Sequence, residues 1–185
     1  MKDKFNPLFE TYTFNNGVAA KNRLAIAPLT HWSADKDGHA TDEELAYLKA
    51  RAHGFGLFIS AATAVSREGI GFTGQPAAYH EADEASLAKR AMVMKSGGAL
   101  AIAQLQHAGA AALTSLNGGV AYAPSLLANQ EIDTLGIQLK VRTEALTEEG
   151  IQKVIRDFAY ATELAIRAGF DGIELHGANG YLLQQ

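Results

Sequence analysis

The stretch AGFDGIELHGANGYLL, residues 168–183, carries a short apolar run with a group of polar residues directly after it. The run DGIELH (171–176) is typical of a buried strand that ends on a histidine, and Asn179 and Tyr181 follow it closely. An imidazole, an amide and a phenol placed together can bind an oxygen atom or move a proton. The pattern therefore predicts a strand followed by a reactive loop, with His176, Asn179 and Tyr181 as candidate site residues.

Upstream of this stretch, apolar strand-like runs alternate with helical patterns. After an N-terminal hairpin, strands are predicted at 23–28, 55–65, 99–109 and 171–176. Helices are predicted at roughly 42–52, 81–98 and 146–170, and the segment between 109 and 146 is predicted to be a long loop. Alternating strands and helices favour a parallel sheet joined by right-handed crossovers.

Local signals define the element ends. Asn16-Gly17 is expected to form the hairpin turn, because this pair tolerates positive φ at both central positions. Thr41, with Glu44 three residues later, has the pattern of a capping box. In the longest helix, apolar or small residues recur at helical spacing and predict one buried face: Ile151, Val154, Ile155, Phe158, Ala161, Thr162 and Ala165.

The strands point to a barrel rather than to an open dinucleotide-binding sheet. They are apolar along their whole length, and no G-x-G-x-x-G fingerprint follows the first of them. A (β/α)8 barrel needs about 250 residues. This chain has 185 residues and four strands, so residues 1–185 are expected to form the N-terminal half of a single barrel domain. That half comprises the hairpin and about the first four β/α units.

Composition excludes several classes of function. The net charge of −4, from 16 basic and 20 acidic residues, argues weakly against a nucleic-acid partner. Cysteine is absent, which excludes thiolate nucleophiles, disulfides and cysteine-ligated metals, and no metal site is predicted. No run of about eighteen apolar residues exists, and the first residues, MKDKFNPLFE, lack a signal-peptide core. The expectation is a cytoplasmic protein without a membrane segment.

Polar residues also follow or interrupt the earlier strands. Barrel enzymes build their active sites at the carboxyl ends of the strands, where Thr30 and Trp32 lie after the first strand. Gln104 stands inside an otherwise apolar strand, and burying an unpaired amide costs about 2–7 kcal/mol, so a functional role is favoured. Thr30 could instead cap a turn, Trp32 could be part of the core, and His107 is expected to be a hydrogen-bonded structural histidine.

Four segments in order resemble strand motifs of the old yellow enzyme family, the FMN-dependent ene-reductases and NAD(P)H:flavin oxidoreductases. They are NRLAIAPLTHWSADKDGHATDEELAYLKARA, FGLFISAATAVSREG, AIAQLQHAG and AGFDGIELHGANGYLL, and the resemblance runs from about Asn6 to the last residue. It implies a TIM barrel with FMN at its carboxyl-terminal mouth, NADH or NADPH as reductant, and the N-terminal hairpin closing the barrel floor.

The resemblance also implies cofactor-binding residues. Thr30 would lie near O4 and N5 of the flavin, Ala62 would contact the ring edge through its backbone, and Gln104 would bind the pyrimidine side at O2 or N3. An amide suits that edge because the ring presents alternating donors and acceptors there. The segment that passes beside the flavin would be Ala27, Pro28, Leu29 and Thr30.

For the substrate, the resemblance implies a small electrophile such as an enone or a nitro compound. His176 and Asn179 would bind its activating oxygen, Tyr181 would deliver a proton to the α-carbon, and Trp32 would lie over the substrate. The family pattern continues through four more strands, which carry a basic residue near the flavin and the phosphate-binding loops. The chain is therefore expected to need a C-terminal barrel half.

Two alternatives remain open. The first is another barrel enzyme, such as an aldolase or isomerase, which would need a Schiff-base lysine or a carboxylate base at the mouth. Glu174 could be such a base, but strand alternation favours an orientation toward the helix layer. The second is a non-catalytic half-barrel that pairs with a second polypeptide or with a copy of itself as a homo-oligomer.

Overall fold

The computed structural model describes residues 3–127, 130–134 and 137–185. Its main sheet is parallel, and its strand order is β11-β6-β4-β3. The four strands on this path are β3 (Ala25–Ile26), β4 (Leu57–Ile59), β6 (Leu100–Gln106) and β11 (Gly172–Leu175). Each lies within one of the four predicted strand ranges, so the predicted order of parallel strands is confirmed.

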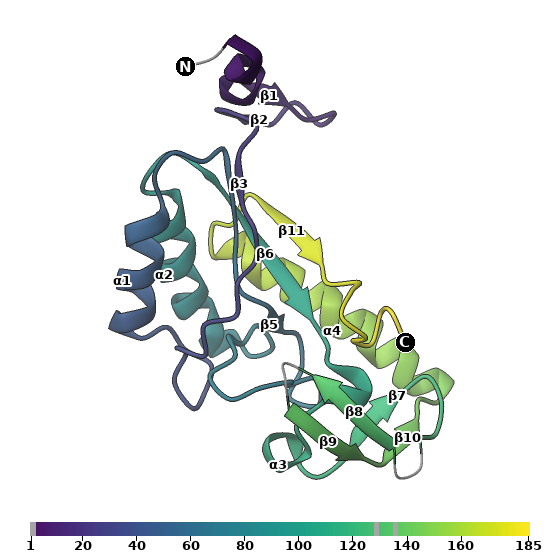
Figure 1. Cartoon of the computed structure of the whole chain (residues 1–185). Coiled ribbons are helices and arrows are strands. Elements are labelled where there is room, and N and C mark those ends of the chain that lie inside the picture. Colours follow the sequence, from purple (N-terminus) through teal and green to yellow (C-terminus); the bar gives the residue numbers. More distant parts are fainter. Residues whose placement is uncertain (1–2, 128–129, 135–136) are drawn as a thin grey trace.

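Three helices connect these strands and cover one face of the sheet (Figure 1). They are α1 (Asp42–Arg51), α2 (Glu84–Lys95, preceded by the 3-10 turn η2, Glu81–Asp83) and α4 (Glu148–Arg167). In β6, Ala101, Ala103 and Leu105 point into the core beneath the helices. By alternation, Gln104 points to the opposite side of the sheet, which these three helices do not cover.

The N-caps of α1 and α4 are threonines. The hydroxyl of Thr41 accepts a hydrogen bond from the Glu44 N–H at 3.2 Å, and that of Thr147 accepts one from the Gly150 N–H at 3.1 Å. The predicted capping box at Thr41 is wrong in its second half. The Glu44 carboxylate binds the guanidinium of Arg90 on α2 instead of the Thr41 backbone, because a buried cation is the stronger partner.

The predicted N-terminal hairpin is present, with β1 (Tyr12–Thr13) antiparallel to β2 (Ala19–Ala20), after the 3-10 helix η1 (Asp3–Phe9). Its turn differs from the prediction, because Gly17 has φ +86° whereas Asn16 does not have positive φ. The Gly17 N–H donates to Phe14 O at 2.9 Å, so Asn15 and Asn16 are the central residues of that turn. The hairpin lies at the end of the sheet where the parallel strands begin (Figure 1).

The segment predicted as one long loop contains regular structure, so that prediction is wrong. Strands β8 and β9 form an antiparallel pair, and β10 pairs with β7 in parallel. The elements are η3 (Gly109–Ala111), α3 (Thr114–Asn117), β7 (Ala121–Ala123), β8 (Gln130–Thr134), β9 (Ile137–Val141) and β10 (Thr143–Ala145). The predicted strand 55–65 is also interrupted: the β4 ladder ends at Ile59, and β5 (Thr63–Ala64) pairs separately with β6.

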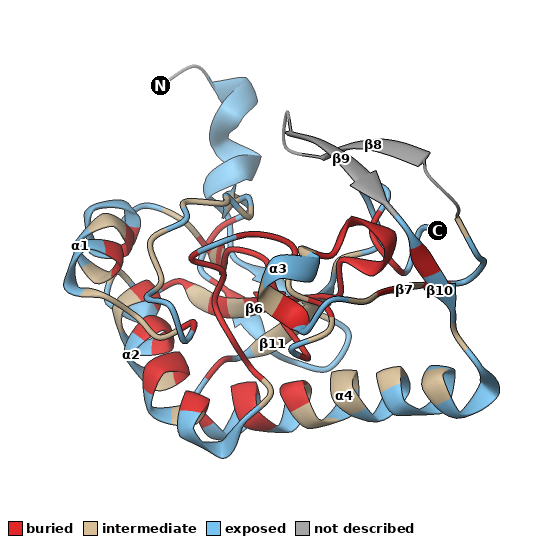
Figure 2. Ribbon diagram, turned by 90° about the horizontal axis from the view of Figure 1, so that it is seen from below, coloured by how far each residue is buried: buried red, intermediate tan, exposed pale blue. Residues whose placement is uncertain are grey.

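Helix α4 is buried along only part of the predicted apolar face. Ala161, Leu164 and Ala165 are buried against the core, whereas Ile151 and Ile155 are 43% and 55% exposed. Figure 2 shows the buried residues of α4 gathered toward its carboxyl-terminal end, near α2. The amino-terminal half of α4 therefore leaves two large apolar side chains, Ile151 and Ile155, exposed to solvent. None of the described helices is long and apolar enough to cross a membrane.

Candidate active site

A cavity of about 550 Å³ opens at the carboxyl ends of β3, β6 and β11. Its wall combines residues from the loops after these strands with Gln104 from within β6. Seven of the ten residues predicted from the sequence line it: Pro28, Thr30, Ala62, Gln104, His176, Asn179 and Tyr181. The structure thus brings the two predicted groups, one for a cofactor and one for a substrate, to a single cavity.

The other three predicted residues lie elsewhere. Ala27 and Leu29 line a separate, mostly apolar cavity of about 300 Å³ next to Tyr47 of α1. Pro28 lies between them and lines both cavities. Trp32 lines neither cavity, is 58% exposed and has φ +50°. The roles of all ten residues stay predictions.

The loop after β11 is held by a tight turn. The Tyr181 N–H donates to Ala178 O at 3.2 Å, and the two central residues, Asn179 and Gly180, have φ of +58° and +70°. Positive φ at both positions is the combination of a type I′ turn, which favours Asn-Gly because both residues tolerate this region. Asn179 therefore serves the local fold as well as contributing its amide to the cavity.

His176 and Tyr181 are in contact within this loop. Their rings meet edge to face, with centroids 5.1 Å apart and planes at 80°. The Leu182 N–H donates to His107 O at 3.1 Å, which ties the loop to the end of β6. Burial lowers the pKa of His176, and the nearby Glu174 carboxylate partly offsets this shift. At neutral pH the imidazole is therefore neutral and retains one N–H to donate.

A buried amide network supports the Ala62 side of the cavity. The Gln75 side-chain nitrogen donates to Ala62 O at 3.2 Å and to Gln106 Oε1 at 2.6 Å, and Gln75 Oε1 accepts from the Gly71 N–H at 2.8 Å. The sequence reasoning missed Gln75, because it lies outside any periodic segment and only the fold brings it under Ala62.

Glu174 was expected to face the helix layer, and that expectation is wrong. Its carboxylate accepts a 2.6 Å hydrogen bond from Gln104 Nε2, and it lines the same cavity as His176. Glu174 and His176 are two residues apart, so they share one side of the strand, and that side is the cavity side. Strand alternation would have predicted the cavity-facing orientation of Glu174 if His176 had been taken as the residue that faces the cavity.

His107 is a structural histidine, as the sequence suggested. It is 3% exposed, and its Nδ1 accepts a hydrogen bond from the Gly109 N–H at 3.1 Å. Burial lowers its pKa to about 4. Within the described residues, no group of three or more His, Cys, Asp or Glu side chains is placed to hold a metal ion.

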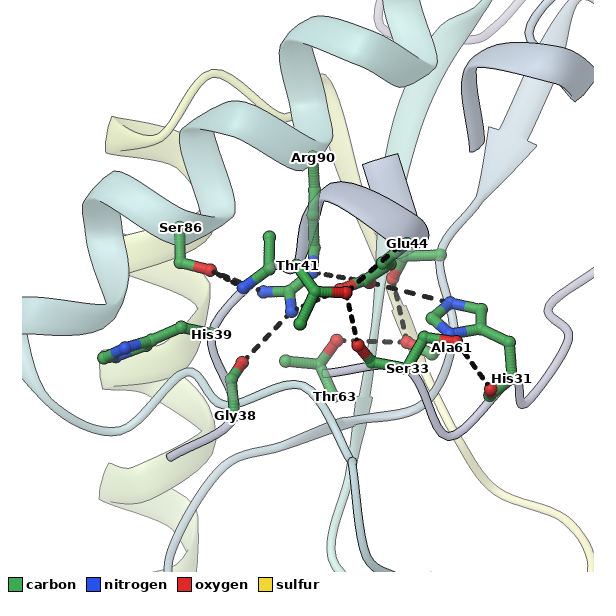
Figure 3. Close-up of polar contacts among 12 residues, drawn as sticks. His31, Ser33, Gly38, His39, Thr41, Glu44, Ala61, Thr63, Ser86 and Arg90 are labelled. Atoms are coloured by element: carbon green, nitrogen blue, oxygen red, sulfur yellow. Dashed lines mark hydrogen bonds and ion pairs between the residues drawn. The ribbon is translucent and has the colours of Figure 1, made fainter. Parts of the chain in front are cut away.

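The segment after β3, which carries Thr30, is fixed to α2 by polar contacts (Figure 3). Arg90 Nη2 donates to Gly38 O at 3.1 Å, and the Ala40 N–H donates to Ser86 Oγ at 2.6 Å. Thr41 adds a hydrogen bond to Ser33 O at 2.7 Å. These contacts hold the part of the segment that leads into α1.

The chain matches a known protein family and several named proteins. The sequence profile of the "NADH:flavin oxidoreductase / NADH oxidase family" matches residues 7–185. A Bacillus subtilis protein named "Probable NADH-dependent flavin oxidoreductase YqiG" is 38% identical over all of this chain and 48% of its own length. The "NADH:acrylate oxidoreductase" of Vibrio harveyi is 37% identical over 96% of this chain and 17% of its own length.

Among solved structures, an old yellow enzyme homologue from Zymomonas mobilis superposes with a TM-score of 0.84 at 33% identity. The alignment covers 95% of this chain and 49% of that protein, so the chain spans about half the length of such relatives. The predicted (β/α)8-barrel class is confirmed, with about half of the barrel in this chain. The chain belongs to the NADH:flavin oxidoreductase / NADH oxidase family.

Proposed function

We propose that the protein carrying this chain uses FMN, with NADH or NADPH as reductant, to reduce C=C bonds activated by a carbonyl group. Enones are the proposed substrate class, and nitro compounds are a related one. The main observation in support is a single cavity lined by the residues predicted for both the cofactor and the substrate: Thr30, Gln104, His176, Asn179 and Tyr181. The name of the Vibrio harveyi relative supports the same chemistry, since acrylate is a C=C bond conjugated to a carboxylate.

The cavity suits the ring of FMN better than its phosphate. Its volume of about 550 Å³ lies within the range of about 300–1,000 Å³ that is common for cofactor sites. Thr30 and Gln104 offer neutral donors and acceptors that match the ring edge. The residues that line the cavity include no lysine or arginine, so the phosphate needs a cation from outside this wall.

Bound FMN supplies the hydride chemistry, and the residues of this chain bind the substrate and move a proton. The imidazole of His176 and the amide of Asn179 donate hydrogen bonds to the substrate oxygen. Two donors at that oxygen stabilise the negative charge that develops as the β-carbon is reduced. The phenol of Tyr181 then donates its proton to the α-carbon. Tyr181 is 4% exposed, so its ring also keeps water away.

Anaerobic absorbance measurements on the complete protein test this proposal. Mixing the FMN-loaded protein with NADH or NADPH should bleach the flavin, and a subsequent enone should restore its colour. The assignment is wrong if the complete protein binds FMN but neither step occurs. Nitro compounds in place of the enone measure the breadth of the substrate class.

The remaining expectations also stay proposals. The small electrophile is the proposed substrate, and a further barrel half, from the same or another polypeptide, is the proposed partner for the open sheet. Homo-oligomer formation and a cytoplasmic location stay predictions. Glu174 lies where a carboxylate base would be needed for an isomerase, but its hydrogen bond with Gln104 gives it a different role.

A further inference from the structure

Gln104 and Glu174 are opposite each other in the paired strands β6 and β11. The Gln104 side-chain nitrogen donates to Glu174 Oε1 at 2.6 Å, and both residues line the cavity. Gln104 is 5% exposed, and its backbone N–H donates to Ser60 Oγ at 3.0 Å. The main chain and the side chain of Gln104 are therefore both fixed.

The contact with Glu174 decides which way the amide faces. A glutamine amide fits equally well after a half turn that exchanges its oxygen and nitrogen, so a partner has to select one orientation. A carboxylate only accepts hydrogen bonds, which requires the nitrogen to face Glu174. The Gln104 carbonyl oxygen then has no partner among the described residues and is left as an acceptor for a ligand in the cavity.

The same carboxylate dominates the charge of the cavity wall. Glu174 is the only acidic residue among those that line the cavity, and no lysine or arginine lines it. Burial keeps the pKa of His176 below its ordinary value, so this ring adds no positive charge at neutral pH. A ligand that gains negative charge beside Gln104 therefore experiences a repulsion from Glu174 that no lysine or arginine of the cavity lining cancels.

We propose that Glu174 is a positioning residue for FMN: it orients Gln104 so that the amide oxygen accepts the N3–H of the flavin ring, and its charge lowers the flavin reduction potential. The inference rests on the proposed function, because it requires the flavin ring in this cavity. The potential falls because reduction adds negative charge to the pyrimidine side of the ring, next to the carboxylate.

A double-mutant cycle on the FMN dissociation constant tests the orienting role in the complete protein. Glu174→Ala frees the amide, and Gln104→Ala removes it. Each change should weaken FMN binding by up to about tenfold, as expected for the loss of one hydrogen bond. Because both changes remove the same interaction, the double variant should be no weaker than Gln104→Ala alone. If the two effects multiply, the orienting role is wrong.

Glu174→Gln separates orientation from charge. Its side-chain oxygen can still accept from Gln104, so FMN affinity should stay near that of the unmodified protein, while the reduction potential should become more positive. Equilibration with a reference dye measures the reduction potential. This measurement on Glu174→Gln tests whether the charge of Glu174 lowers the potential, even if Glu174→Ala does not fold. An unchanged potential in Glu174→Gln overturns that role.

Glu163→Gln is the matched control, because it makes the same chemical change on the exposed face of α4, where Glu163 pairs with Arg167 at 3.3 Å. It should alter neither the FMN affinity nor the reduction potential.

The proposed function and the proposed role of Glu174 fail in different ways. If the unmodified protein binds no FMN, both are wrong. If it binds FMN and turns over while the Glu174 variants behave like the control, only the role of Glu174 is wrong.

Discussion

Glu44 of α1 and Arg90 of α2 form a buried bidentate ion pair, with Nε–Oε1 and Nη2–Oε2 distances of 2.8 and 2.9 Å. The side chains are only 1% and 2% exposed. Arg90 also donates to Gly38 O and Ser86 Oγ, so the pair joins two helices to the segment after β3 (Figure 3).

Removing one partner of this pair should be costly. Arg90→Met leaves the Glu44 carboxylate buried without its cation, which should lower the free energy of unfolding by about 3–5 kcal/mol. The double replacement Glu44→Leu with Arg90→Met should recover most of this loss, because no buried charge remains. Urea unfolding curves of the complete protein measure both changes. A loss below about 1 kcal/mol for Arg90→Met would show that the pair contributes little.

Tyr181→Phe should separate the two half-reactions. Flavin reduction by NADH or NADPH should stay nearly unchanged, because the phenol takes no part in it. Enone reduction should slow by about a hundredfold or more, because the proton donor is lost. Stopped-flow absorbance follows each step separately. Comparable losses in both steps would contradict the proton-donor role.

The double variant His176→Ala with Asn179→Ala should weaken the binding of enones and of phenol-type ligands before it affects flavin reduction. The reason is that, in the proposed mechanism, the two donors act on the substrate oxygen and not on the flavin. Spectral titration of the oxidised flavoprotein with a phenol measures this binding. Unchanged affinity in the double variant would place the oxygen-binding donors elsewhere.

The pKa of His176 should be measurable and should respond to Glu174. Burial lowers this pKa below 6.5, and the Glu174 carboxylate raises it by a smaller amount. In an NMR titration, the ring should therefore change its protonation below pH 6.5, and Glu174→Gln should move the midpoint to still lower pH. A midpoint that rises in Glu174→Gln would contradict this electrostatic assignment.

His107 should make the fold sensitive to acid. Its pKa is about 4 in the folded state and 6.5 in the reference state, so the unfolded chain binds the proton more tightly. This contribution to the free energy of unfolding is fully present above pH 6.5, falls progressively between pH 6.5 and 4, and amounts to about 3 kcal/mol. His107→Gln should flatten this part of the pH dependence in urea unfolding, and an unchanged slope would assign it to other groups.

The sequence predicted the parallel strand order and the helices well, because each strand is mostly apolar and the helix starts carry strong signals such as Thr41. It also located seven of the residues that line the cavity, because the carboxyl ends of parallel strands meet at one edge. The loop-like segment was missed because its strands lack a continuous apolar run: β8 is QEIDT, β9 is IQLKV and β10 is TEA. A short apolar run was the signal that identified the strands of the main sheet.

Errors at single residues came from competition between local and long-range partners. Glu44 has the spacing for a capping box, but Arg90, 46 residues away in sequence, provides a charged partner inside the core. Asn16-Gly17 was expected to have positive φ at both positions, but only Gly17 does. In Asn179-Gly180, both residues have positive φ. The same dipeptide thus adopts two turns, and the segments around each pair decide which one forms.

The isolated 185-residue chain should not behave as a compact monomer. Within the described sheet, β3 and β11 are the edge strands, and Leu175 on β11 is 59% exposed. Unpaired strand edges promote association, and large apolar surfaces are rarely left uncovered on monomers. We therefore expect aggregation, a molten state, or a dimer in which two halves close one barrel. FMN binding should be weak in each case, because the proposed contacts of Thr30, Ala62 and Gln104 reach only the ring. Sedimentation velocity and flavin titration measure these properties, and a cooperative monomer that binds FMN at micromolar concentration would contradict the expectation.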